Sequence, residues 1–197
     1  MKLQTVWCLL VVSLPAAYGQ AAEAYISGGQ AIFRNEALGV GQSGQPSLFY
    51  RFKDSSFRIG ARLALNTKRF IGHEIGYAYS PSHVVLDTVP GDIKISSHQY
   101  FYNFLGYLIS EGSTFRPFIA VGGHLNTFYP PGTSVSYGNG VTKVGFNYGA
   151  GFKIKAGSMF ALRFDVRDYA TMKPFDFPEK KGLLHQIEAS AGFGIHF

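Results

Sequence analysis

The most constraining feature of the chain is its last segment, residues 186–197 with His185 before it, in which polar and apolar residues alternate without interruption from Gln186 onward. The apolar set is Ile187, Ala189, Ala191, Phe193, Ile195 and Phe197, and the polar set is Gln186, Glu188, Ser190, Gly192, Gly194 and His196. Because successive side chains of a β-strand point to opposite faces, this segment has one oily face and one polar face. The chain therefore ends in a strand that lies between an apolar and a polar environment.

Similar alternation recurs along the chain and predicts an all-β protein. The aromatic content of 16% and the 24 glycines agree with short strands, whereas helical periodicity is poor. The eight expected strands cover residues 24–33, 57–66, 70–80, 97–109, 115–128, 143–155, 160–169 and 183–197.

The connections between these strands alternate in length. Long ones cover residues 34–56, 81–96, 129–142 and 170–182, and short ones cover 67–69, 110–114 and 156–159. This places the long loops at one end and the tight turns at the other, with both termini at the turn end. We therefore expect an eight-stranded antiparallel up-and-down β-barrel.

The N-terminal residues have the pattern of an export signal. Lys2 precedes an uncharged run over residues 3–14, and Ala17 and Gly19 are the small residues that signal peptidase requires. We expect residues 1–19 to be a cleaved signal peptide, with a cut after Ala24 as the second choice, and residues 20–197 to form one domain. A transmembrane anchor is the alternative, but a run of about a dozen residues is shorter than the roughly 20 that a spanning helix needs.

Removal of this signal peptide narrows the possible chemistry. The only cysteine, Cys8, lies inside it, so the mature chain has no thiol for a disulfide, a metal site or a nucleophile. Loss of Lys2 lowers the formal net charge from +6 to +5, which suits anionic lipid headgroups, and export argues against nucleic acid as a partner. The longest later uncharged stretch, residues 117–142, is interrupted by Pro130 and Pro131, so the mature chain is expected to cross a membrane only with strands.

The strand faces distinguish a membrane barrel from a soluble one. In the seventh strand Phe164 shares a face with Val166, and Arg163, Asp165 and Arg167 share the other. A soluble, lipocalin-like barrel would have the apolar face inside. Glycine-rich polar faces fit a crowded polar interior, and aromatic residues at the ends of the apolar faces fit the girdles of a membrane barrel. We therefore expect a transmembrane barrel with its charged residues inside, although the face of the fourth strand stays unassigned.

The chain resembles the small eight-stranded outer-membrane proteins, the OmpA-like and OmpX-like barrels of the outer membrane protein β-barrel domain. The resemblance covers residues 24–197 and rests on the signal peptide, the strand count, the Arg163, Asp165, Arg167 series with Asp168 and Tyr169, and the terminal strand ending at Phe197. It implies a bacterial outer-membrane location in a Gram-negative envelope. The terminal strand, with Phe193, Ile195 and Phe197, resembles the signal that the barrel-assembly machinery recognises.

An eight-stranded barrel has an interior just wide enough for its side chains to fill, so inward charges must pair with one another. The residues expected in this ion-pair network are Arg58, Arg62, Glu74, Lys153, Arg163, Asp165, Arg167 and Glu188, together with the polar residues His124, Asn126 and Asn147. We expect the network to be structural; a proton or ion path and an anion site are the alternatives.

The sequence favours a structural or surface-interaction role over catalysis. The nearest groups to a lipid A-modifying site are His124 with Asn126, and His185 with Glu188 and Ser190, but His185 and Ser190 project to opposite faces of a strand. We expect no enzyme activity, no metal site, since the histidines are dispersed, and no cofactor. A small-conductance pore and a lipid A-modifying enzyme stay as alternatives.

The long connections carry the residues most suited to a partner. The aromatic and basic ones are Phe49, Tyr50, Arg51, Phe52 and Lys53 in the first, expected to prolong the second strand, and Lys173, Phe175, Phe177, Lys180 and Lys181 in the fourth. We expect a monomer that contacts outer-membrane lipid and lipopolysaccharide, and that meets the barrel-assembly machinery during insertion.

Overall fold

The computed structural model describes residues 21–34, 37–40, 49–53, 55–86, 89–129, 140–174 and 182–197, and all of its regular elements are strands. The strands are β1 (Ala21–Arg34), β2 (Ala37–Val40), β3 (Phe49–Phe52), β4 (Ser55–Lys68), β5 (Ile71–Leu86), β6 (Val89–Tyr107), β7 (Phe115–Tyr129), β8 (Val141–Ala156), β9 (Phe160–Met172) and β10 (Leu183–His196). The segment predicted as a signal peptide lies outside these residues. No helix within the described part of the chain is long and apolar enough to cross a membrane.

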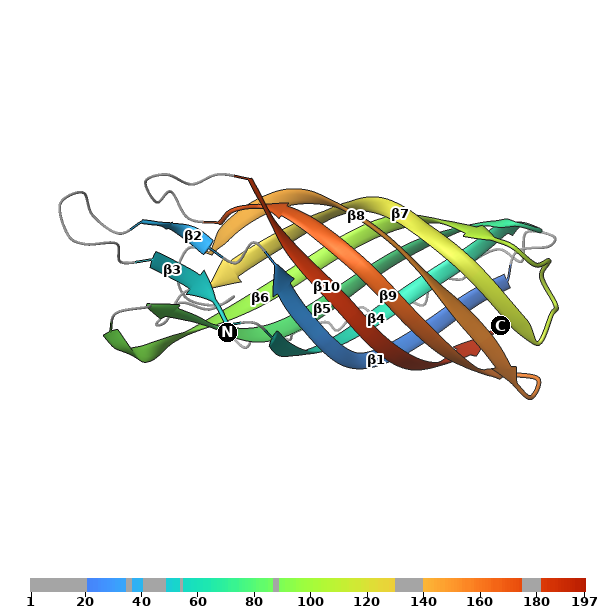
Figure 1. Ribbon diagram of the computed structural model, residues 1–197. Helices are drawn as coiled ribbons and strands as arrows, with labels where there is room; N and C mark the ends of the chain where they lie inside the picture. The colour runs from blue at the N-terminus through green and yellow to red at the C-terminus, as the bar shows by residue number, and fades with distance from the viewer. Residues whose placement is uncertain are drawn as a thin grey trace, which may run out of the picture.

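Eight of the strands form a closed antiparallel barrel. The hydrogen-bonded order runs β5, β4, β1, β10, β9, β8, β7, β6, and pairing of β5 with β6 closes the ring. The strands are steeply tilted around a long cylinder (Figure 1). Reciprocal backbone hydrogen bonds between Ala22 and Phe197 join the two ends of the described chain at 3.0 and 2.9 Å. The expected fold is confirmed.

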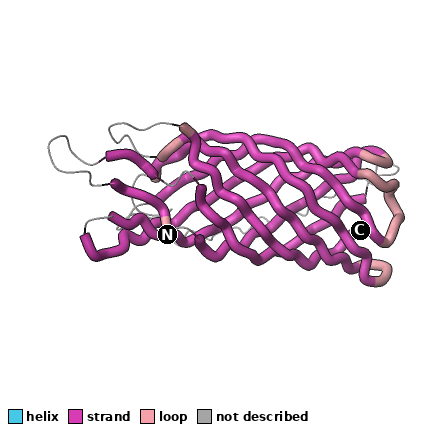
Figure 2. Tube along the Cα trace, in the orientation of Figure 1, coloured by secondary structure: helices cyan, strands magenta, loops and turns pink. Residues whose placement is uncertain are grey.

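The short turns lie at one end of the barrel, together with Phe197, and the long connections lie at the other (Figure 2). The β8–β9 turn contains Gly157 with φ of +88°, a backbone conformation that favours glycine. We call the opposite end, where β5 and β6 meet and where β2 and β3 lie, the loop end.

Two predicted connections contain strands. Residues 81–96 were expected to be a loop, but β5 continues to Leu86 and β6 begins at Val89, so this region is a long hairpin. Phe49–Phe52 forms a separate short strand, β3, which pairs with β2 and continues the line of β4 along the same edge of β5. Both strand pairs extend past the barrel at the loop end (Figure 1).

The wall has the predicted polarity. On β9, Arg163 and Asp165 are buried at 1% and 4% exposure, whereas Phe164 and Val166 are on the outside at 38% and 59%. The unassigned strand β6 follows the same rule, because Phe101 is buried and Tyr100 is exposed. The lipocalin-like alternative is therefore wrong, because the apolar face of each barrel strand points outward.

Glycine on the inner face makes room for large neighbours. A Cβ added to Gly151 would lie 2.7 Å from Cζ of Phe118, and one added to Gly149 would lie 2.8 Å from Cγ of Arg167. These positions allow aromatic and arginine side chains to cross a narrow lumen.

Candidate functional site

The middle of the barrel holds a continuous set of ion pairs, which we call the lumen network. Its members are Arg58, Arg62, Glu74, Arg163, Asp165, Arg167 and Glu188, and all are at most 4% exposed. Asp165 is its centre: its carboxylate lies 3.0 Å from Arg62 and 2.8 Å from both Arg163 and Arg167. A buried carboxylate persists when it is surrounded by donors in this way.

The other two carboxylates extend the lumen network across the barrel. Glu74 on β5 lies 2.6 Å from Arg163 and 2.7 Å from Arg167. Glu188 on β10 pairs with Arg62 and lies 3.0 Å from Arg58. These contacts tie β4 and β5 to β9 and β10 through the interior, so the network crosslinks the wall as well as filling the lumen.

Four arginines face three carboxylates in the lumen network, and aromatic rings contact the guanidinium groups. The Arg58 guanidinium lies 4.8 Å from the ring centre of Tyr169, and that of Arg163 lies 4.7 Å from the ring centre of Phe118. Cation–π contacts of this kind favour a desolvated cation.

Lys153, predicted in the same network, forms a separate pair nearer the turn end. Its ammonium group pairs with Glu23 and donates a hydrogen bond to the Tyr107 hydroxyl at 2.7 Å. The Arg116 guanidinium stacks on the Tyr107 ring and donates a hydrogen bond to the carbonyl oxygen of Arg69 at 3.2 Å. Sequence reasoning missed Glu23, because the first strand was expected to begin one residue later.

At the loop end the lumen is closed by apolar side chains, which we call the apolar cap. The cap consists of Phe33, Phe52, Val84, Ile95, Phe128 and Leu184. Phe52 comes from β3 and lies stacked on Phe33, with ring centres 4.9 Å apart, and 5.7 Å from Phe128. Phe52 and Phe128 are fully buried. The apolar cap therefore lies between the charged middle and the loop end.

The predicted polar residues lie between the lumen network and the apolar cap. His124 contacts the Thr171 hydroxyl through Nε2 at 2.7 Å, and Asn126 accepts a hydrogen bond from Ser97 at 2.6 Å. Asn147 is fully buried. All three point inward.

The outer wall carries a polar cluster that sequence reasoning missed. The Tyr148 hydroxyl donates to Asp168 Oδ2 at 3.0 Å, and His185 Nδ1 lies 2.8 Å from the same oxygen. We call these three residues the wall triad. Asp168 shares the outer face of β9 with Phe164 and Val166, so the alternation of side chains along this strand could have placed Asp168 on the outer wall.

The residues considered for catalysis do not converge. Ser190 donates to Glu188 inside the lumen, whereas His185 faces outward, as the opposite parity of the two positions predicted. Within the described residues, no group of three or more histidine, cysteine, aspartate or glutamate side chains could hold a metal ion.

The three residues of the predicted assembly signal lie on the outer face at the turn end. Phe193, Ile195 and Phe197 are 53%, 40% and 67% exposed. Their role in assembly stays a prediction. Of the basic loop residues, Lys173 is buried at 6% exposure, and residues 175–181 lie outside the described part of the chain.

The comparisons with known proteins agree with this geometry. Residues 5–197 match the family described as outer membrane protein beta-barrel domain. No curated protein shows a significant match. Similar solved structures include Neisserial surface protein A, with a TM-score of 0.57, 13% identity, and 91% of this chain and 97% of that one covered.

Two further structures have the same fold. Ail, the attachment invasion locus protein of Yersinia pestis, solved with the heparin analogue sucrose octasulfate, has a TM-score of 0.53 at 10% identity, over 90% of this chain and 99% of that one. The N-terminal barrel domain of Pseudomonas aeruginosa OprF has a TM-score of 0.51 at 13% identity, over 90% and 97%. At these identities the likeness concerns the fold.

Proposed function

We propose that this chain, which belongs to the outer membrane protein β-barrel domain family and lies in the bacterial outer membrane, is a monomeric, non-conducting barrel that presents its loop end at the cell surface. In this role it stabilises the membrane locally and contacts lipid or a partner, without enzyme activity. The observation that carries the proposal is the filled lumen, with charges in its middle and the apolar cap above them.

The described loop end supports a surface role. The β5–β6 hairpin and the β2–β3 pair continue the sheet past the closed barrel, and β3 is joined to β5 by backbone pairing from Tyr50 to Phe52. A sheet extension of this kind offers a more rigid surface than an irregular loop. Two structural neighbours, a surface protein and an attachment invasion protein, have names that agree with this role.

The conductance of purified protein in planar bilayers tests the proposal. We expect no stable large single-channel steps, because ions would have to pass both the apolar cap and the lumen network. Phe52→Ala removes one aromatic ring from the apolar cap. It should still give no single-channel steps, because the lumen network stays intact. Stable steps from the wild-type protein would favour the pore alternative.

Surface exposure and catalysis need separate measurements. Protease added to intact cells should cleave at the loop end and leave the barrel protected. In cell fractionation, recovery in the soluble periplasmic fraction would contradict the location of the barrel. Incubation with lipid A followed by mass spectrometry should give no mass change, and a lost acyl chain would favour the enzyme alternative.

A further inference from the structure

We propose that the outer wall carries a docking site for one lipid A molecule, with its phosphate at the wall triad and an acyl chain in an adjoining groove. This inference deepens the lipid contact of the proposed function and rests on it for the membrane location and for the placement of the loop end at the cell surface.

The groove crosses β1, β10, β9 and β8 on the outer face. Its floor is made of the small residues Gly28, Ala150, Ala189 and Ala191, and Val166 and Gln30 also line it. Phe152 and Phe164, stacked with ring centres 5.0 Å apart, form one side. Small residues beside fixed aromatic rings leave a hollow in the wall, and an acyl chain fits it.

The wall triad borders this groove on the side of the loop end. Asp168 is the next outward residue after Val166 on β9, and Tyr148 is the corresponding neighbour of Ala150 on β8. Outward residues two apart along a strand are about 7 Å from each other. The polar cluster is therefore directly continuous with the apolar hollow.

The order of the two parts matches the orientation of a lipid in the outer leaflet. The triad lies nearer the loop end, where a headgroup would be, and the groove runs from it toward the middle of the wall. An ionisable pair on the lipid-facing wall is costly unless it has a specific use. His185 and Asp168 are 29% and 18% exposed, so they remain within reach of a ligand.

The charges near the triad favour a phosphate. Arg34 is exposed on β1 and lies directly opposite His185 in the β1–β10 register, which brings their Cβ atoms to about 5 Å. When His185 donates Nδ1–H to Asp168, its Nε2 is left for a ligand. The Arg34 guanidinium and the protonated His185 ring would then bind a phosphate together, while Asp168 and Tyr148 hold the ring in place.

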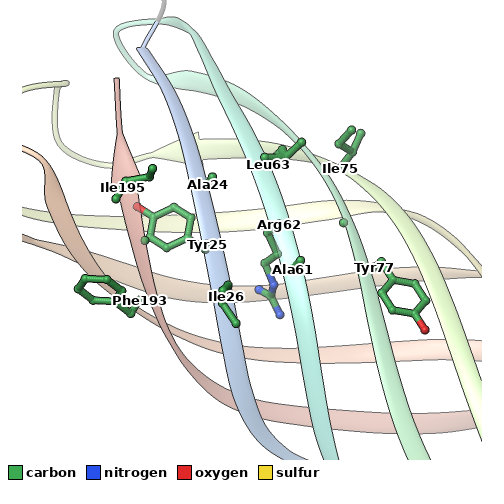
Figure 3. Close-up of a pocket in the computed structure, with 12 residues that line it drawn as sticks. Ala24, Tyr25, Ile26, Ala61, Arg62, Leu63, Ile75, Tyr77, Phe193 and Ile195 are labelled. Carbon is green, nitrogen blue, oxygen red and sulfur yellow. The ribbon is translucent and has the colours of Figure 1, made fainter. Parts of the chain in front are cut away.

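A second hollow in the wall provides a comparison. Ala24 and Ala61 form its floor, and Ile26, Leu63 and Ile195 surround it (Figure 3). Arg62 also lines it, but that side chain is 2% exposed and pairs inside the lumen. This hollow lies toward the turn end, in the half of the wall that faces the inner leaflet, and we expect it to take any acyl chain without preference for lipid A.

Native mass spectrometry of the purified full-length protein in nanodiscs tests the site, with lipid A, dephosphorylated lipid A and phosphatidylglycerol as separate probes. We expect one tightly bound lipid A per barrel and at least about tenfold weaker binding of dephosphorylated lipid A, because its two charge-assisted contacts would be lost. Phosphatidylglycerol keeps a phosphate, but as a diester with a single charge, and should bind more weakly than lipid A and more tightly than dephosphorylated lipid A. The double variant Arg34→Ala, His185→Ala should weaken lipid A binding by a similar factor.

A steric variant tests the groove independently. A Cβ at Gly28 would meet no atom within 4 Å, so Gly28→Leu should fold normally and fill the groove, and lipid A binding should fall. The matched controls are Ala61→Leu in the second hollow and Lys94→Ala, an exposed cation on β6, and both should bind like the wild type. Heat-modifiable migration in gels confirms that each variant is folded.

Equal binding of dephosphorylated lipid A would overturn the proposal. So would unchanged binding by both the double variant and Gly28→Leu, or an equal loss in the two controls. These results do not depend on conductance, so failure of the lipid site is distinguishable from failure of the non-conducting surface role.

Discussion

Two aspartates on β9, three residues apart, are held in different ways. Asp165 points into the lumen and is contacted by Arg62, Arg163 and Arg167. Asp168 points to the outer wall and is contacted by Tyr148 and His185, and it keeps 18% of its side-chain surface exposed. The same residue type on one strand therefore has a closed set of partners inside and an open set outside.

This difference separates a structural charge from one that can serve a ligand. The charge of the inner carboxylate is compensated by Arg62 from β4 and by two arginines of its own strand, so it links β4 to β9 and has no capacity left for another partner. The outer carboxylate contacts a histidine that keeps 29% of its side-chain surface exposed. The comparison predicts large stability effects inside the barrel and small ones at the triad.

The largest effect is expected from Asp165→Ala. This change leaves three arginines without their shared partner, and breaking a buried charge network from one side costs about 3–5 kcal/mol. The measurement is urea unfolding of the refolded protein in lipid vesicles. Asp168→Ala is the matched control and should cost much less; equal losses would show that the inner and outer aspartates are not held differently.

The lumen network is the part of the site that the sequence predicted best. Strict alternation assigned Arg163, Asp165 and Arg167 to one face, and the glycine-rich polar faces and aromatic ends of the apolar faces predicted that this face lies inside. The choice of partner could not be predicted: Lys153 pairs with Glu23 across the lumen, and that contact depends on the stagger of the closed sheet.

An intermediate effect is expected from Phe164→Arg, which tests the boundary between the two faces. A charged side chain on the lipid face near the midplane costs about 2–4 kcal/mol. Phe164→Leu is the control, since it keeps an apolar side chain at the same place, and the same vesicle unfolding assay applies. If Phe164→Arg were harmless while Arg163→Leu prevented insertion, the inside and outside of β9 would be reversed.

The structure of the loop end and the contacts of the wall triad could not be predicted from the sequence, for physical reasons. Residues 81–96 include Pro81, Pro90 and Gly91, which indicate turns locally, yet pairing between β5 and β6 continues through Pro81. Similarly, Tyr148, Asp168 and His185 lie on three different strands, and only the register brings them together. Local pattern determines the face of a residue, whereas register determines its neighbours.

The smallest effect on stability is expected from Asp168→Asn. The amide oxygen still accepts from Tyr148, and a pair at the edge of the lipid-facing wall contributes little, so the loss should be below about 1 kcal/mol in the vesicle unfolding assay. Asp165→Asn is the control and should lower the free energy of unfolding several times more, because the negative charge that three arginines share would be removed. A loss at Asp168→Asn as large as that at Asp165→Asn would make the triad a structural clamp, like the lumen network. A small loss together with weaker lipid A binding would separate the two aspartates by their function as well as their position.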